Sequence, residues 1–329
     1  MRFSKNKVFF KRLFGALRSC NRAAYLGIAL TATAPATRLV DKLLGLFLTS
    51  DKAYDGKMPP CVFIVCAPRS GGTIVYQVLA RVIPSVYLSN LHALFPRFAS
   101  SFMFKRNLFG RNLSNGSNYY GHTPQLYDVN ESNNFLEAIF KDDAGTDMIR
   151  ARFSNMLRKM NCSPDRPFII KNVRVGYQSI QKLHDAIPEF RFIRVRRNIE
   201  HVIRSELRAH YELGTFHPIP LALENCDMKD PVSFATFQIS EIEKIIDSQL
   251  KQVDPSAWVE WRYEDFCVNA KEMIESFVKT HLSLSGASLR DDAILDSLDP
   301  SAGGKVSRQD GEHISALLEQ LKTPDTKSK

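Results

Sequence analysis

The sequence CVFIVCAPRSGGT, at residues 61–73, decides the fold because it joins an apolar run to a glycine-rich turn. A continuous apolar run bounded by turn residues is typical of a strand that a parallel sheet buries on both faces. The spacing of apolar residues from Thr73 to Val82 is helical. The stretch therefore predicts a buried strand, a tight turn and a helix that starts directly after the turn.

The turn has the composition of an anion-binding loop. Gly71 and Gly72 let the backbone approach a ligand closely, and Ser70 and Thr73 add hydroxyl donors. A Walker A loop would place a lysine directly before the last Ser/Thr, whereas here Gly72 precedes Thr73 and the cation is Arg69. The turn predicts a phosphate site of another kind than Walker A, with an ordinary strand-to-helix turn as the alternative.

The chain after this turn alternates strands with helices. Such alternation indicates an α/β fold of the P-loop-like, three-layer kind, with a central, mostly parallel sheet flanked by helices. We expect strands near residues 86–88, 167–172, 190–195 and 257–263, and helices within 135–160 and near 179–187, 200–210, 233–250 and 271–282.

A second anion site is predicted in RRNIEHVIRS, residues 196–205, which follows a strand and opens a helix. Arg197 and Ser205 are eight residues apart, a spacing that can bring a guanidinium and a hydroxyl onto one phosphate. A solvated, basic helix start would have the same composition. Two anion sites in this order along the chain make the functional interpretation stronger than either does alone.

Both motifs resemble those of sulfotransferases that use 3′-phosphoadenosine 5′-phosphosulfate (PAPS). The sequence PRSGGT is similar to the 5′-phosphosulfate loop of that family, with Gly72 where a threonine is usual. Residues 196–205 resemble its 3′-phosphate segment, with Ile199 in place of a frequent proline.

The resemblance implies PAPS as the co-substrate and a reaction that requires no metal. It implies that Arg69 contacts the bridging oxygen and the transferring sulfuryl group. The residues that it assigns to the two phosphates of the nucleotide are Ser70, Gly71, Gly72 and Thr73 for the 5′-phosphate, and Arg197 and Ser205 for the 3′-phosphate.

Further candidates come from two other segments. FIIKNV (168–173) resembles the strand whose terminal lysine approaches the sulfuryl group in some members, which makes Lys171 a candidate cation; a lysine that snorkels from a strand end is the alternative. A general base must take the proton of the acceptor hydroxyl, and His92 and Glu131 both stay open for this role. WRYEDF (261–266) also resembles the family, and we interpret it as the structural start of a helix.

One departure from the family bears on the acceptor. Cytosolic members that act on phenols and steroids carry an aromatic residue just past the phosphate loop, where this chain has Ile74. The resemblance therefore favours the bacterial or Golgi-type branch, with a carbohydrate or glycolipid as acceptor. The alternatives are an atypical P-loop kinase, which would need a Walker lysine and a magnesium-binding acid, and a non-catalytic, membrane-associated nucleotide-binding protein.

Charge separates the N-terminal segment from the rest of the chain. Residues 1–60 hold 11 Lys/Arg against 3 Asp/Glu, which leaves 33 against 32 in residues 61–329. A nearly neutral body argues against nucleic acid as a partner, since such proteins carry a basic face on the folded domain. We expect a basic amphipathic segment and linker in residues 1–60 and a sulfotransferase catalytic domain in residues 61–329.

Residues 1–49 allow three interpretations. Residues 1–22 hold seven basic residues and no acid, interleaved with apolar ones, which is typical of a helix on an anionic membrane surface. The uncharged stretch at 23–37 is shorter than the ~20 residues that cross a bilayer. A peripheral membrane helix, a helix packed on the domain and a signal or anchor stay open. The expected location is the cytoplasm or the inner face of the membrane, with the Golgi membrane as the eukaryotic alternative.

Overall fold

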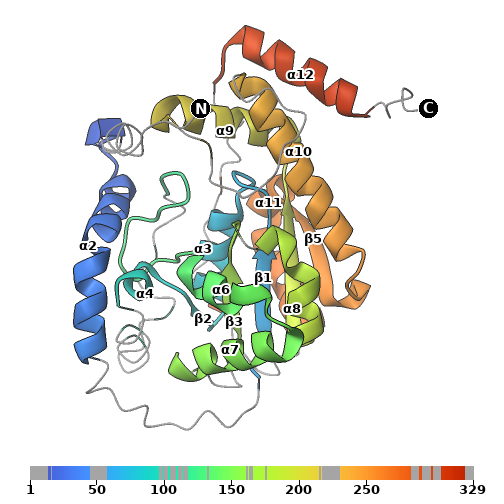
Figure 1. Cartoon of the computed structure of the whole chain (residues 1–329). Coiled ribbons are helices and arrows are strands. Elements are labelled where there is room, and N and C mark those ends of the chain that lie inside the picture. The colour runs from blue at the N-terminus through green and yellow to red at the C-terminus, as the bar shows by residue number, and fades with distance from the viewer. Residues whose placement is uncertain are drawn as a thin grey trace.

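Five parallel strands form one sheet in the order β2-β3-β1-β4-β5 (Figure 1). They are β1 (Cys61–Val65), β2 (Val86–Tyr87), β3 (Phe168–Lys171), β4 (Phe190–Arg196) and β5 (Trp258–Arg262). The computed structural model describes residues 14–15, 17–44, 58–95, 118–131, 133–160, 166–174, 176–214, 230–282 and 305–322, together with residues 99, 103, 109, 113, 162, 216, 289, 290 and 298.

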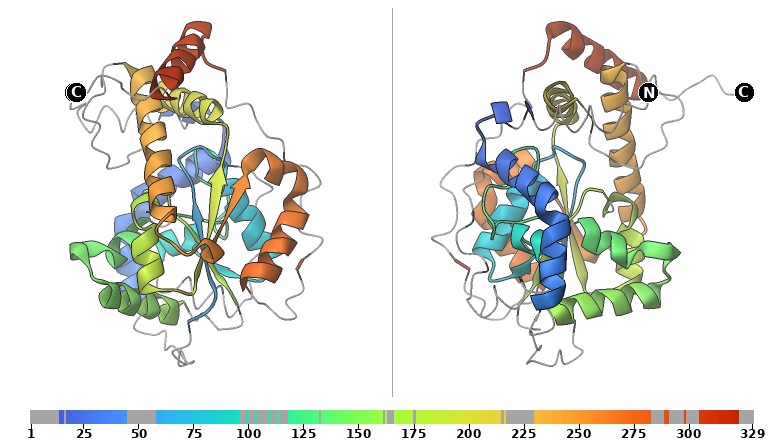
Figure 2. Two further views of the ribbon diagram at one scale, coloured as in Figure 1. Left: turned by 90° about the vertical axis from the view of Figure 1, so that its right-hand side faces the viewer. Right: turned by 60° about the vertical axis from the view of Figure 1, so that its left-hand side comes forward.

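Helices cover both faces of the sheet, so the predicted three-layer α/β fold is confirmed. On one face, α8 (Ile180–Ala186) packs against α10 (Pro231–Leu250); on the other, α3 (Gly72–Val82) contacts β3 and α11 (Tyr263–Phe277) contacts β5 (Figure 2). The other helices are α2 (Arg22–Leu44), α4 (Asn90–Leu94), α6 (Asn133–Ile139), α7 (Thr146–Lys159), α9 (Ile199–Leu213) and α12 (Arg308–Lys322), with one-turn helices at Lys141–Asp143, Gly176–Gln178 and Pro255–Ala257 and a π-helix at Val278–Leu282.

For α11, the helix start expected in WRYEDF is confirmed and the start expected near residue 271 is wrong. The helix begins at Tyr263, directly after β5, and not near residue 271. Its backbone is non-helical at Asn269, with φ −121° and ψ 31°, so the helical pattern that predicts a start near 271 is only the part beyond this kink. Glu264 and Asp265 occupy the first turn, where acidic side chains interact favourably with the helix dipole. The segment WRYEDF therefore contains the strand end and the helix start together.

The burial of β1 follows from its place at the centre of the sheet. Its five residues are almost completely buried, because strands lie on both sides of it and helices on both faces. On one face, the ring of Phe63 lies 6.1 Å from that of Phe190 and 6.2 Å from that of Phe192, measured between centroids. These aromatic contacts fix β1 against β4, and with them the points at which the turn at residues 67–71 and the segment after β4 leave the sheet.

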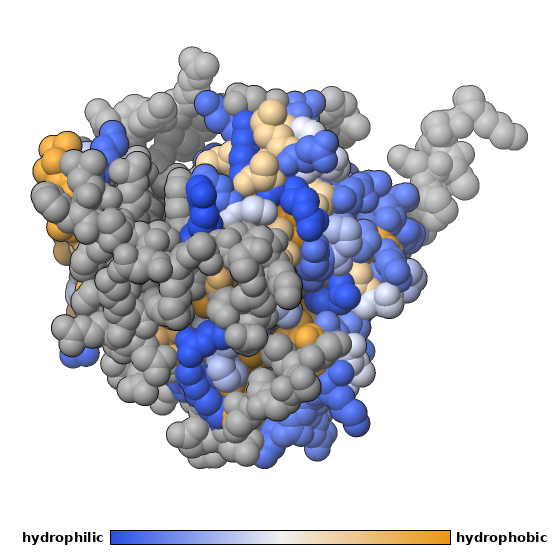
Figure 3. All heavy atoms as spheres, turned by 90° about the horizontal axis from the view of Figure 1, so that it is seen from below, coloured by the Kyte–Doolittle hydropathy of each residue, from blue (hydrophilic) through white to orange (hydrophobic). Residues whose placement is uncertain are grey.

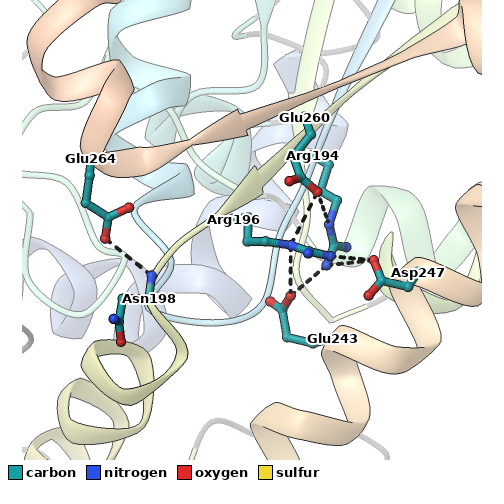
Figure 4. Close-up of polar contacts among 7 residues, drawn as sticks. All are labelled: Arg194, Arg196, Asn198, Glu243, Asp247, Glu260 and Glu264. Atoms are coloured by element: carbon teal, nitrogen blue, oxygen red, sulfur yellow. Dashed lines mark hydrogen bonds and ion pairs between the residues drawn. The ribbon is translucent and has the colours of Figure 1, made fainter.

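An ion-pair cluster holds α10 against the sheet (Figure 4). Arg194 of β4 is 1% exposed, and its Nη2 lies 2.6 Å from Glu243 Oε2 and 3.1 Å from Asp247 Oδ1, both on α10. Its Nε lies 3.4 Å from Oε2 of Glu260, its register partner on β5. Arg196 shares the same three carboxylates. Since desolvation offsets most of the attraction in buried ion pairs, we interpret the cluster as fixing α10 and the end of β4 in place.

The N-terminal helix α2 packs on the body along one side only. Ala23 and Ala24 are buried, and α2 contacts α4. Its other side exposes large apolar side chains, with Leu39 63% and Leu43 56% exposed. Figure 3 shows apolar surface at the left edge, the flank on which α2 lies in Figure 1.

The interpretations of the N-terminal segment fall only in part on α2. Residues 1–13 and most of the predicted linker lie outside the described residues. In the part of the chain that the structure describes, no helix has the length and apolar content that crossing a bilayer demands. The division into residues 1–60 and 61–329 stays a prediction.

Candidate active site

The candidate active site lies at the carboxyl edge of the sheet, where three neighbouring parallel strands end. From β1 the chain goes to β2 and β3 on one side of the sheet, and then to β4 and β5 on the other. Ligands of open α/β sheets bind at such a switch point, beyond the carboxyl ends of the strands. Three predicted features begin at this edge: the turn after β1, Lys171 at the end of β3, and Arg197 directly after β4.

The turn after β1 has an unusual backbone. Arg69 has a φ of 67°, and Gly71, the N-cap of α3, a φ of 88°. A non-glycine residue at positive φ costs free energy, persists only where the surrounding structure enforces it, and is found often at functional sites. The turn ends at the N-terminus of α3, whose first N–H groups lack partners within the helix and attract anions. Ser70 is buried there, and its Oγ has no hydrogen-bond partner among the described residues.

Gly72 is a glycine because its neighbours leave no room for a side chain. A Cβ at this position would lie 2.5 Å from Cys66 Sγ and 2.9 Å from Lys171 Cε. The thiol and the lysine stem thus fill the space that the family's usual threonine would need. Burial raises the pKa of Cys66 to about 11, so the thiol is neutral at physiological pH.

Arg69 connects the two segments that are predicted to bind anions. Its Nε donates a hydrogen bond to Ser205 Oγ at 3.1 Å, and its backbone oxygen accepts one from Arg197 Nη1 at 3.2 Å. Burial lowers the pKa of Arg69, and the carboxylate of Glu206 opposes this shift, but an arginine stays protonated in either case. The structure therefore brings Arg69, Arg197 and Ser205 together on one surface that carries two cations and a hydroxyl.

Lys171 and Glu131 form an ion pair beside the turn after β1. Lys171 Nζ donates a hydrogen bond to Glu131 Oε1, and the side chain of Lys171 is 4% exposed. The backbone N–H of Val173 donates to Glu131 Oε2 at 3.3 Å, which orients the carboxylate. Burial acts to lower the pKa of Lys171, but the carboxylate of Glu131 outweighs it and the pKa is raised. The ammonium of Lys171 is thus kept charged next to the turn after β1, in contact with the Glu131 carboxylate.

His92 lies in a different environment. Its side chain is fully buried, and its Nδ1 accepts a hydrogen bond from the backbone N–H of Ser89 at 3.1 Å, which completes a capping box at the start of α4. Its ring packs against that of Phe109, with centroids 6.3 Å apart. Burial lowers the pKa of His92 to about 3, so the imidazole is neutral.

Two tyrosines that sequence reasoning missed surround the arginines. The guanidinium of Arg69 lies over the ring of Tyr120, 4.8 Å from its centroid, and the Tyr120 hydroxyl donates to Glu212 of α9. The guanidinium of Arg197 lies over the ring of Tyr263 at 4.9 Å. Because each partner comes from a distant segment, no local spacing could have found these contacts; the family-like WRYEDF segment was the one available signal for Tyr263.

The chain is similar to known proteins in its sequence and in its fold. A model described as the sulfotransferase family matches residues 60–280, well over half of the chain. The solved structure of sulfotransferase STF1 from Mycobacterium tuberculosis aligns with a TM-score of 0.51 at 14% identity, over 95% of this chain and 86% of that one. Sulfotransferase STF9 from Mycobacterium avium aligns with a TM-score of 0.48 at 11% identity, over 98% of this chain and 79% of that one. A search of curated proteins gave no match.

Structural likeness at such low identity shows the fold alone. The family model is matched by the sequence itself, and its 60–280 span contains every strand of the sheet and each residue of the candidate site. From the sequence match, and not from the fold, it follows that the chain belongs to the sulfotransferase family and is a sulfotransferase enzyme.

Proposed function

We propose that the chain transfers the sulfuryl group of PAPS to a hydroxyl of a carbohydrate or glycolipid. The observation that carries the proposal is the meeting of two anion-binding motifs at Arg69, through Ser205 at 3.1 Å and Arg197 at 3.2 Å. PAPS has a phosphosulfate at its 5′ end and a phosphate on its 3′ oxygen, so a protein that binds it needs two adjacent anion sites. Members of the sulfotransferase family generally use this donor.

The residues of the site fit PAPS. The buried Ser70 Oγ, without a partner among the described residues, is suited to a phosphate oxygen, since a buried hydroxyl that stays unpaired costs free energy. In this proposal, residues 69–73 hold the 5′-phosphosulfate, and Arg197 with Ser205 holds the 3′-phosphate. Arginine suits this role because its planar fork matches phosphate oxygens. The scheme uses no metal.

When bound, PAPS supplies the sulfuryl group: its sulfur bonds to the acceptor oxygen as its bond to the 5′-phosphate oxygen breaks, and adenosine 3′,5′-bisphosphate leaves. Such in-line transfer depends on position and on cations that stabilise spread-out charge. Lys171 and Arg69 provide these cations, and the charge of Arg69 is close enough to act on the pKa of Lys171, which it lowers. Burial of Lys171 strengthens its effect, because little water screens it.

The same proposal assigns the general base to Glu131 and a capping role to His92. The Glu131 carboxylate is partly exposed, lies against the Lys171 ammonium, and is oriented by the N–H of Val173. It can take the proton of an acceptor hydroxyl that approaches the sulfuryl group. His92 is fully buried among Ser89 and Phe109, which gives an acceptor no access to it.

The acceptor class rests on two features. Ile74 occupies the position just past the phosphate loop at which members that act on phenols and steroids carry an aromatic residue. The exposed apolar side of α2, together with the basic first sixty residues, suits an acceptor that is presented at a membrane. Mass spectrometry of glycans and lipids from cells with and without the chain tests the assignment: we expect a sulfated glycan or lipid that depends on the chain. Sulfation of small phenols alone would contradict it.

Calorimetry with adenosine 3′,5′-bisphosphate tests the nucleotide site. We expect Arg197→Ala to weaken its binding about 10- to 100-fold, because a charge-assisted hydrogen bond to phosphate is lost. Arg69→Ala is expected to weaken it less, about 3- to 10-fold, and to lower kcat as well, since Arg69 also faces the transferring group. Equal affinities in the wild type and both variants would refute the site. Preference for ADP with magnesium would favour the kinase, and tight bisphosphate binding without turnover the non-catalytic protein.

The exposed side of α2 is proposed to dock on an anionic lipid surface. Leu39 and Leu43 offer the apolar contact, and the excess of basic residues in the first sixty gives charge complementarity to acidic headgroups. In sedimentation with vesicles, we expect binding to phosphatidylglycerol and not to phosphatidylcholine. The double variant Leu39→Ser/Leu43→Ser should weaken binding about tenfold or more, whereas Val268→Ser, at an exposed apolar residue of α11, should not change it. Equal binding to both lipids would contradict the proposal. It would also be contradicted if the chain dimerises and the double variant abolishes the dimer, because the exposed side of α2 would then bind a second copy of the chain.

A further inference from the structure

Tyr263 stands where the ends of β4 and β5 meet. The register pairs Arg196 of β4 with Arg262 of β5, so the next residues, Arg197 and Tyr263, leave the sheet side by side. Tyr263 is the first residue of α11 and is buried. The sheet itself therefore places an aromatic ring next to the arginine of the second anion-binding motif.

The ring of Tyr263 touches both anion-binding segments. A Cβ added to Gly71 would lie 2.2 Å from Tyr263 Cδ2 and 2.3 Å from Cε2, which shows that the ring packs directly on the glycine backbone. The guanidinium carbon of Arg197 lies 4.9 Å from the ring centroid, within the range of a cation–π contact. Both contacts are made by the ring, and the Tyr263 hydroxyl is hydrogen-bonded to the side chain of Cys267.

Two hydrogen bonds complete the connection. Arg197 Nη1 donates to the backbone oxygen of Arg69 at 3.2 Å. The turn after β1 therefore contacts Arg197, Arg197 contacts the ring of Tyr263, and that ring contacts Gly71 of the same turn. The residue after Tyr263, Glu264, accepts a hydrogen bond from the backbone N–H of Asn198 at 3.3 Å, as Figure 4 shows. The start of α11 thus contacts the segment after β1 through one residue and the segment after β4 through two.

We propose that Tyr263 is a positioning residue that fixes the distance between the 5′ and 3′ phosphate sites. The inference rests on the proposed function, because it needs both sites to be used by one nucleotide. A ligand with two anionic groups gains from the second group only when both sites are held at the matching separation. In this scheme Tyr263 acts on the two phosphate sites through its contacts with Gly71 and Arg197.

The test compares the affinities of adenosine 5′-monophosphate and adenosine 3′,5′-bisphosphate by calorimetry. The ratio of the two dissociation constants measures what the 3′-phosphate contributes to binding. In Tyr263→Leu we expect this ratio to fall about tenfold, the size of a buried cation–π contact and its ordering effect. Tyr263→Phe keeps the ring and is expected to keep the ratio. Phe277→Leu, at another buried aromatic residue of α11, controls for lost stability and should leave the ratio unchanged.

The outcomes separate this inference from the proposed function. If the wild type binds the bisphosphate no better than the monophosphate, the 3′-phosphate site itself is refuted. If the wild type prefers the bisphosphate to the monophosphate and folded Tyr263→Leu shows the same preference, the 3′-phosphate site is supported and the positioning role of Tyr263 is overturned. If Tyr263→Leu does not fold, Tyr263→Met is measured instead, since it keeps an apolar side chain of similar size and loses the ring face; an unchanged ratio there overturns the role equally.

Discussion

Replacing Lys171 with methionine is expected to lower kcat by about two to three orders of magnitude, the usual effect of removing a buried group that stabilises transition-state charge. The methionine keeps the apolar stem that fills the space beneath Gly72 and removes only the ammonium. Adenosine 3′,5′-bisphosphate has no sulfuryl group, so its affinity should stay within about threefold. Steady-state kinetics and calorimetry with the bisphosphate measure the two effects separately.

This variant also leaves the carboxylate of Glu131 without its ammonium partner, which costs stability. Thermal unfolding must therefore show that Lys171→Met is folded at the assay temperature. Lys182→Met is the matched control, because Lys182 pairs with Asp143 on the exposed surface and should leave kcat unchanged. A folded Lys171→Met enzyme with near-normal kcat would remove Lys171 from the mechanism.

The sheet, and the positions along it of the two segments predicted to bind anions, could be predicted because their signals are local. The apolar run of β1, the glycines after it and the spacing of Arg197 and Ser205 each lie within a short stretch, and a parallel sheet brings the ends of its strands to one edge. The sequence alone therefore placed these segments near one another. The sequence alone could not show that the two segments contact each other at Arg69.

Contacts between distant segments explain what was missed. Lys171 and Glu131 were both candidates, but nothing in the sequence pairs residues from separate segments into one ion pair. Gly72 could be recognised as a departure from the family, yet its cause is the packing of Cys66 and Lys171. The apolar spacing beyond residue 271 misplaces the start of α11, because a kink at Asn269 divides the helix.

Glu131→Gln is expected to lower kcat by about two to four orders of magnitude, because the amide cannot take the proton of the acceptor hydroxyl. Glutamine has nearly the same shape, but its one oxygen can accept from Lys171 or from Val173 and not from both, because these groups donate to different oxygens of Glu131. We therefore expect a modest loss of stability, with the fold kept and the affinity for the bisphosphate little changed. Kinetics at saturating PAPS isolate the effect on kcat. Glu131→Ala should lose as much, and added formate should restore part of its rate by acting as a small external base.

His92 provides the contrasting variant, since the sequence left both bases open. His92→Asn removes a buried imidazole that caps α4 and packs on Phe109, so it should lower the melting temperature. If Glu131 is the base, the folded His92 variant keeps a near-normal kcat and formate has no effect on it. A large loss of kcat in folded His92→Asn, with Glu131→Gln close to wild type, would transfer the role to the histidine. It would also require a movement that exposes His92, because in this structure its imidazole is fully buried in contact with Ser89 and Phe109.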